Sequence, residues 1–142
     1  MKKTPICYVG SPMIQTQHEK WLGDVIHSGG EQPSIDATIG DRKPKVMNSI
    51  RESISIIEDT RMNKLGGVQC ALDIWEMSII PSLLNNADTW SALKEDHLSQ
   101  LENVQLYFLR SLLAVPKSTP KPALYLDSDT MLMKFTIKQI LT

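Results

Sequence analysis

The sequence has few cysteines, almost no net charge and no long apolar run, and each of these absences excludes a class of protein. Its two cysteines, Cys7 and Cys70, are too few for a disulfide framework or a cysteine-based metal site. We expect both to be reduced thiols in a cell, although the two could in principle form one bridge. The formal net charge of -1 provides no overall attraction to nucleic acid or anionic membranes, so any such binding requires a local patch.

The order of apolar and polar residues also predicts no signal peptide and no membrane-spanning helix. No uninterrupted apolar run approaches the roughly 18 residues that a membrane-spanning helix needs. The N-terminal residues 1–3 are basic, but Tyr8 to Gln17 is too polar to be the apolar region of a signal peptide. We therefore expect an intracellular protein with no signal peptide, no transmembrane segment and no membrane partner.

The first thirty residues predict a small β element. Ile6 to Val9 is a β-prone run, residues 10–12 are typical of a turn, and Met13 to Thr16 is expected to be the returning strand. A third apolar-rich run covers Trp21 to Ile26. Gly23 lies inside that run, where a glycine suggests a bulge or the close approach of another backbone.

The rest of the chain predicts three long helices. The first covers about Ser34 to Arg61, with Ser34 as its N-cap, and is either kinked near Pro44 or divided there into two helices. Residues 64–67 are expected to separate it from a central helix in Val68 to Trp90. Its most apolar face is formed by Val68, Ala71, Leu72, Trp75, Ile79 and Leu83, and Pro81 should kink or end it.

The third long helix is predicted from Lys94 to Leu113, and Pro116 stops it. Thr119-Pro120 opens a short helix through Leu126, residues 127–129 are a turn, and Met131 to Leu141 is a possible terminal helix. The predicted fold class is therefore mainly α: a helical bundle of antiparallel neighbours with a small N-terminal antiparallel β element.

No catalytic or metal-binding arrangement stands out in the sequence. The histidines His18, His27 and His97 are scattered, so each is expected to be a surface or capping residue. Asp127 and Asp129 could reach one divalent cation, but a turn and cap need no metal. We expect no catalytic residue, no metal ligand and no cofactor.

One basic cluster could contact phosphates. Four cations lie near the start of the first predicted helix: Arg42, Lys43, Lys45 and Arg51. Arg61 and Lys64 follow the end of that helix. Such a cluster could bind a nucleic-acid backbone without reading its sequence. The alternative is a solvated face balanced by Asp41, Glu52 and Glu58, and composition alone favours this alternative.

Five segments occur in an order that is similar to a known family. They are EKWLGD (Glu19 to Asp24), IGDR (Ile39 to Arg42), IIPSLLNNADTW (Ile79 to Trp90), Leu101-Glu102 with FLRSLL (Phe108 to Leu113), and PKSTP (Pro116 to Pro120) with ALYL (Ala123 to Leu126). In this order they resemble the end of the palm and the thumb of reverse transcriptases from non-LTR (LINE-type) retrotransposons. The resemblance covers about Ile6 to Thr142. In that family the first segment is a β-hairpin called the primer grip.

The resemblance implies a division of the chain and a partner. Residues 1–30 would be a hairpin remnant of the palm, and residues 31–142 a thumb- or connection-like domain. In the family these parts grip the RNA or DNA template–primer duplex. Carried over by position, Trp21, Leu22 and Gly23 would approach the primer strand. In the same way, Arg42, Lys43 and Lys45 could face its phosphates. A close backbone approach would explain the glycine at position 23.

The sequence departs from the family in its catalytic carboxylates. The aromatic-x-Asp-Asp loop that binds the polymerase metals is missing, and no Asp-Asp pair occurs in the sequence. Because a polymerase needs two metal ions held by such carboxylates, we expect a catalytically incomplete fragment. The family also has a glycine where this chain has residues 127–129. Two alternatives remain: a non-enzymatic helical protein-interaction module, and one piece of an active polymerase whose upstream part is encoded separately.

Overall fold

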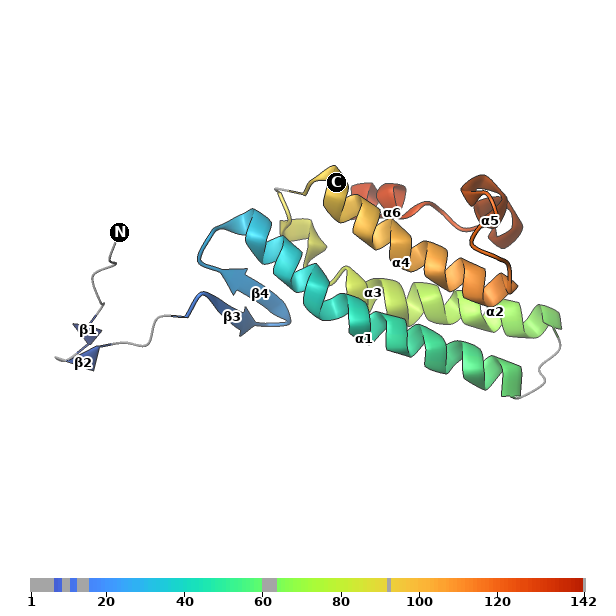
Figure 1. Cartoon of the computed structure of the whole chain (residues 1–142), viewed down its shortest axis with the longest axis horizontal. Helices are drawn as coiled ribbons and strands as arrows, with labels where there is room; N and C mark the ends of the chain where they lie inside the picture. Colours follow the sequence, from blue (N-terminus) through green and yellow to red (C-terminus); the bar gives the residue numbers. More distant parts are fainter. Residues whose placement is uncertain (1–6, 9–10, 13–15, 60–63, 92, 142) are drawn as a thin grey trace.

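The computed structural model describes residues 7–8, 11–12, 16–59, 64–91 and 93–141, and this part of the chain is mainly helical (Figure 1). Two short antiparallel hairpins precede the helices: β1 (Cys7–Tyr8) pairs with β2 (Ser11–Pro12), and β3 (His18–Trp21) pairs with β4 (Asp24–His27). The predicted fold class, mainly α with a small N-terminal antiparallel β element, is confirmed.

The strand boundaries differ from those expected from the sequence. Ser11 and Pro12 belong to β2 and not to a turn. Of the predicted strand Met13 to Thr16, residues 13–15 lie outside the described residues, and Thr16 is not in a strand. The third run, Trp21 to Ile26, is not one strand, because the β3–β4 turn falls inside it.

The turn between β3 and β4 explains the glycine at position 23. Trp21 pairs with Asp24, so Leu22 and Gly23 form a two-residue loop, and their φ angles are +50° and +87°. Two positive φ angles are typical of the tight turns whose twist matches a β-hairpin. A Cβ atom at Gly23 would lie 3.6 Å from Asn85 Nδ2 and 3.8 Å from Arg42 Nη2, which are ordinary contacts. The positive φ, and not a close backbone approach, therefore accounts for glycine here.

The first long helix, α1 (Glu31–Asp59), is a single helix that continues through Pro44. Pro44 leaves the carbonyl of Gly40 without its donor, but both residues are exposed and water can reach that carbonyl. Ser34 is not the N-cap, since the helix begins three residues earlier. Its hydroxyl donates to Gly30 O (2.7 Å) and accepts from the His27 N–H (2.8 Å), which joins β4 to the first turn of α1.

The central helical segment runs through α2 (Lys64–Ile74), the π-helical turn η1 (Trp75–Ile79) and α3 (Ile80–Leu83). The expected break at residues 64–67 is wrong, because α2 already begins at Lys64. Pro81 lacks an N–H and crowds the carbonyl of Met77. The wider π turn, in which the Ile80 N–H donates to Trp75 O, accommodates this loss without ending the helix at the proline.

The remaining helices follow in short steps: η2 (Ala87–Thr89), α4 (Glu95–Leu113), α5 (Lys121–Ser128) and α6 (Met133–Leu141). The helix α4 ends as expected before Pro116, with Ala114 in the left-handed conformation. The turn predicted at residues 127–129 is wrong, since α5 continues to Ser128 and only Asp129 caps it.

The core lies where α1, the central segment and α4 pack side by side (Figure 1). Trp75 stacks on Phe108 with ring centroids 4.6 Å apart, which joins η1 to α4. Four residues of the predicted core face of the central segment are buried (Ala71, Trp75, Ile79 and Leu83), whereas Val68 and Leu72 are only partly buried. In the described part of the chain, no helix combines the length and apolar character required to cross a bilayer.

Candidate nucleic-acid interface

The β3–β4 hairpin presents two large apolar side chains at its tip. Trp21 is 65% exposed and Leu22 is 78% exposed. The opposite face of the hairpin rests on α1, where Val25 is buried and its N–H donates to Thr38 Oγ1 (2.9 Å). Burying a polar hydroxyl such as Thr38 requires a partner of this kind. One face of the hairpin is therefore packed against α1, and its tip is exposed to solvent.

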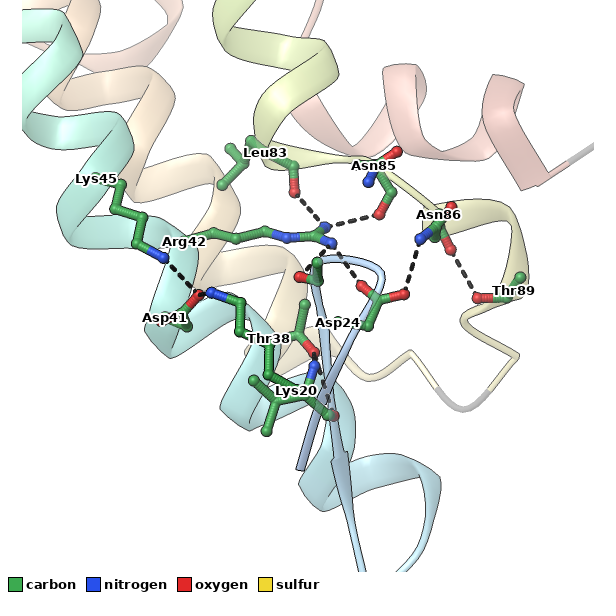
Figure 2. A network of polar contacts seen from close by, with 12 residues as sticks. Lys20, Asp24, Thr38, Asp41, Arg42, Lys45, Leu83, Asn85, Asn86 and Thr89 are labelled. Carbon is green, nitrogen blue, oxygen red and sulfur yellow. Dashed lines mark hydrogen bonds and ion pairs between the residues drawn. The ribbon is translucent and has the colours of Figure 1, made fainter. Parts of the chain in front are cut away.

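Arg42 joins the hairpin to the helices and is not available to an external phosphate (Figure 2). Only 6% of the residue is exposed. Its guanidinium donates to Gly23 O (3.0 Å), Leu83 O (3.2 Å) and Asn85 O (2.7 Å), and it forms an ion pair with Asp24. The expectation that Arg42 faces a nucleic acid is therefore corrected. Its fork of donors instead joins the hairpin, α1 and the end of α3.

The Arg42 contacts extend to the chain after α3. The second carboxylate oxygen of Asp24 accepts from Asn86 Nδ2 (3.0 Å), and the guanidinium lies 5.8 Å from the centroid of the Trp90 ring. Burial lowers the pKa of Arg42, while the charge of Asp24 opposes that shift. This network fixes the position of the hairpin relative to the helices.

Lys45 lies beside the hairpin and shares one carboxylate with Lys20 (Figure 2). Lys20 Nζ and Lys45 Nζ each lie 2.8 Å from Asp41 Oδ2. Hydrogen bonds from Lys20 and Lys45 lower the pKa of Asp41 to about 2. Two cations and one carboxylate leave a net positive charge next to the exposed hairpin tip, on a surface open to solvent.

The four cations of the predicted cluster do not form one patch. Since each helical residue turns the direction by about 100°, Lys43 and Lys45 point roughly 160° apart around α1. Arg51 Nε donates to the Tyr107 hydroxyl of α4 (3.1 Å), and Lys43 lines a groove with residues of α4. The four side chains therefore point in different directions around α1. Arg42 points inward and Lys45 toward the hairpin, whereas Lys43 and Arg51 point toward α4. Arg61 lies outside the described residues, as does the side chain of Lys64.

The groove between α1 and α4 contains two cations, Arg110 and Lys117, that were not predicted from the sequence. Lys43 lines it together with Arg110 and Lys117, and Tyr107 contributes its aromatic ring. Arg110 occurs inside an apolar helical repeat and Lys117 in a loop, so no local spacing connects them to Lys43. Only the packing of α4 against α1 brings the three cations together.

In the part of the chain that the structure describes, the histidines and carboxylates do not form a second site. His97 is a capping residue as predicted, although it is buried: its Nδ1 accepts the Lys94 N–H (3.0 Å), and its Nε2 lies 2.7 Å from Asp36 Oδ1. Among the described residues, no three histidine, cysteine, aspartate or glutamate side chains come together to hold a metal ion. Asp127 and Asp129 are both exposed at the end of α5.

Comparisons with family models, curated proteins and solved structures give no significant match to this chain.

Proposed function

We propose that this chain is a thumb-like, template–primer-binding region of a LINE-type reverse transcriptase. The observation that carries the proposal is the β3–β4 hairpin, which has its two-residue turn inside the EKWLGD segment and exposes Trp21 and Leu22. A hairpin is the form that the family resemblance implies for this segment. An exposed aromatic side chain on an anchored turn is suited to stacking against a base or packing against a sugar.

The helices supply a rigid support for that hairpin. The proposed thumb is the bundle of α1, the central segment and α4, with α5 and α6 as the connecting part. Arg42 joins the hairpin to two parts of this bundle through one buried and one partly buried hydrogen bond. A binding element that is already ordered loses less conformational entropy when the duplex binds.

The charge near the hairpin suits a phosphate backbone. Lys20 and Lys45 lie beside the tip, and a single carboxylate, Asp41, partly neutralises them. Contacts of this kind position a duplex without reading its sequence, and they weaken as salt increases. The proposed contribution of the chain is thus to hold the duplex. DNA synthesis would need metal-binding carboxylates of the Asp-Asp type, which this sequence lacks.

The test is binding of a fluorescein-labelled RNA/DNA primer–template hybrid, measured by anisotropy at low salt. Trp21→Ala combined with Leu22→Ala should weaken binding about 10-fold, since stacking of one base is worth about 1–3 kcal/mol. Leu126→Ala is the matched control, because Leu126 is a similarly exposed apolar residue on α5. Its affinity should stay at the wild-type value.

Two results would contradict the proposal. The first is hybrid binding that does not depend on the hairpin residues. The second is no hybrid binding at low salt, which would favour the protein-interaction module. One observation supports that second candidate: Trp21, Leu22 and Ile26 expose apolar surface on one small hairpin, as docking surfaces do. A primer-extension assay with magnesium should yield no product, and measurable synthesis would refute the incomplete-fragment part of the proposal.

A further inference from the structure

The groove between α1 and α4 concentrates positive charge in a concave surface. It measures about 450 Å³ and is lined by Lys43, Met47, Asn103, Tyr107, Arg110, Ser111, Val115 and Lys117. Three of these residues are cationic, and none of the described residues that line the groove carries a carboxylate. Asn103 and Ser111 add neutral hydrogen-bonding groups. A concave site with this composition favours an anion.

The three groove cations have no internal partner, whereas most of the other described cations have one. Lys20 and Lys45 are bonded to Asp41, Arg42 to Asp24, and Lys121 lies 3.9 Å from Glu102. By contrast, no ion pair or side-chain hydrogen bond joins Lys43, Arg110 or Lys117 to another residue in the described part of the chain. Three unpaired cations around one groove repel one another, and an anionic ligand would relieve that repulsion.

Arg110 also carries an unpaired donor inside the protein. Its Nε atom is buried and has no hydrogen-bond acceptor. Leaving a buried donor of a charged group unpaired costs stability, and native proteins rarely do so without a compensating role. A guanidinium also binds phosphate oxygens well because its donors are arranged in a planar fork.

The groove continues along α1 toward Arg51. A smaller cavity of about 170 Å³ shares Tyr107 and Ser111 with it, and Arg51 lies over the Tyr107 ring at 6.0 Å from the ring centroid. Eight helical residues separate Lys43 from Arg51, which corresponds to roughly 12 Å along the helix axis. Glu58 lines the far end of the smaller cavity and limits the positive stretch there.

We propose that the α1–α4 groove is a phosphate-binding site for the backbone of a single nucleic-acid strand, with Lys43, Arg110 and Lys117 as its contacts. The choice of a nucleic-acid strand rests on the proposed function, while the phosphate chemistry rests on the groove itself. Lys43 points away from the Lys45 and hairpin side of α1, so this strand site is separate from the hairpin surface. It would hold a single-stranded extension of the bound template or primer.

The experiment measures binding of fluorescein-labelled dT8 by anisotropy. Lys43→Gln combined with Lys117→Gln should weaken binding at least 10-fold, and the slope of log affinity against log salt should become less steep by about 1.4, which is 0.7 for each lost phosphate contact. Lys121→Gln combined with Lys134→Gln removes the same charge outside the groove and should change the affinity less than twofold. A dT8 analogue with an uncharged methylphosphonate backbone should not bind.

Arg110→Met tests the Arg110 side chain separately. This variant should bind dT8 at least 10-fold more weakly while its urea midpoint stays at or above the wild-type value, since the substitution removes an unpaired buried donor. If the variant is unfolded, the double lysine variant still decides the question.

The groove site and the hairpin surface are two separate proposals, and the binding experiments give different results for each. Equal losses in the groove and control variants would indicate general electrostatics and overturn the groove site. Binding of the primer–template hybrid through Trp21 and Leu22, without groove-dependent dT8 binding, would overturn the groove and leave the proposed function standing. Groove-dependent dT8 binding, with no effect of the hairpin residues on the hybrid, would support the groove and overturn the hairpin proposal. Inorganic phosphate or dTMP binding as tightly as dT8 would exclude a strand as the ligand.

Discussion

The Asp24 carboxylate and the Arg42 guanidinium form an ion pair that joins the β3–β4 hairpin to α1 (Figure 2). Asp24 follows the two-residue turn directly, so the pair acts at the base of the exposed tip. The same guanidinium also binds backbone carbonyls of Gly23, Leu83 and Asn85. Each of these acceptors would lose its partner if the arginine were removed.

Arg42→Met should therefore lower the free energy of unfolding by about 3 kcal/mol, because it leaves the Asp24 charge and several carbonyls partly buried without a donor. Urea denaturation followed by circular dichroism measures the loss. Lys20→Met is the control, since the Lys20–Asp41 pair is exposed to solvent and its loss should leave the urea midpoint unchanged. Equal effects of the two substitutions would show that the Arg42 network has no special role.

Two glycine-to-alanine substitutions should have opposite effects. Gly23→Ala should destabilise the protein by about 1–2 kcal/mol, because an alanine at φ +87° is strained although space is available. Gly40→Ala should stabilise it by about 0.5–1 kcal/mol, since Gly40 is inside α1 and a Cβ there meets no atom within 4 Å. Paired urea titrations test both values. A stabilising Gly23→Ala would contradict the positive-φ turn.

Trp75→Ala should cost about 3–5 kcal/mol, because it empties a core position and removes the ring that stacks on Phe108. Near-ultraviolet circular dichroism should lose intensity with the buried indole. Met77→Ala changes a neighbouring residue of the same π turn that is 80% exposed, and its effect should stay within about 0.5 kcal/mol. A large effect of Met77→Ala would mean that Met77 packs against the core, and would contradict its exposed position on η1.

Tyr125 should make stability depend on alkaline pH. Burial, followed by the nearby charge of Glu102, raises the pKa of the phenol to about 12 from an ordinary value of 10.0. The folded state thus holds this proton more tightly than the unfolded state, and the resulting stability is present below pH 10 and is lost as pH rises from 10 to about 12. The difference in unfolding free energy between wild type and Tyr125→Phe should shrink over that range. A difference that is constant with pH would contradict the raised pKa.

The sequence by itself determined the elements with strong local patterns. The helical period of α4 predicts one apolar face formed by Leu98, Leu101, Val104, Phe108 and Leu112. Leu101, Val104 and Phe108 are buried there, and Leu98 and Leu112 are partly buried. The period also predicts the core positions of the central segment, because the side-chain direction within one helix depends only on spacing. The position of this turn was harder to predict, since Leu22 and Gly23 form a tight turn inside a run whose apolar residues predict a single strand.

Only the tertiary structure decided what each cation does. Arg42, Lys43 and Lys45 are nearly adjacent in the sequence, yet they point to the hairpin network, the α1–α4 groove and the Asp41 pair. Conversely, Lys43, Arg110 and Lys117 come from distant parts of the chain and line one groove. The physical reason is that charge pairing depends on distances between elements, which no local spacing specifies. The burial of Trp75 and Leu83 in one core, on either side of Pro81, is likewise visible only in the tertiary structure.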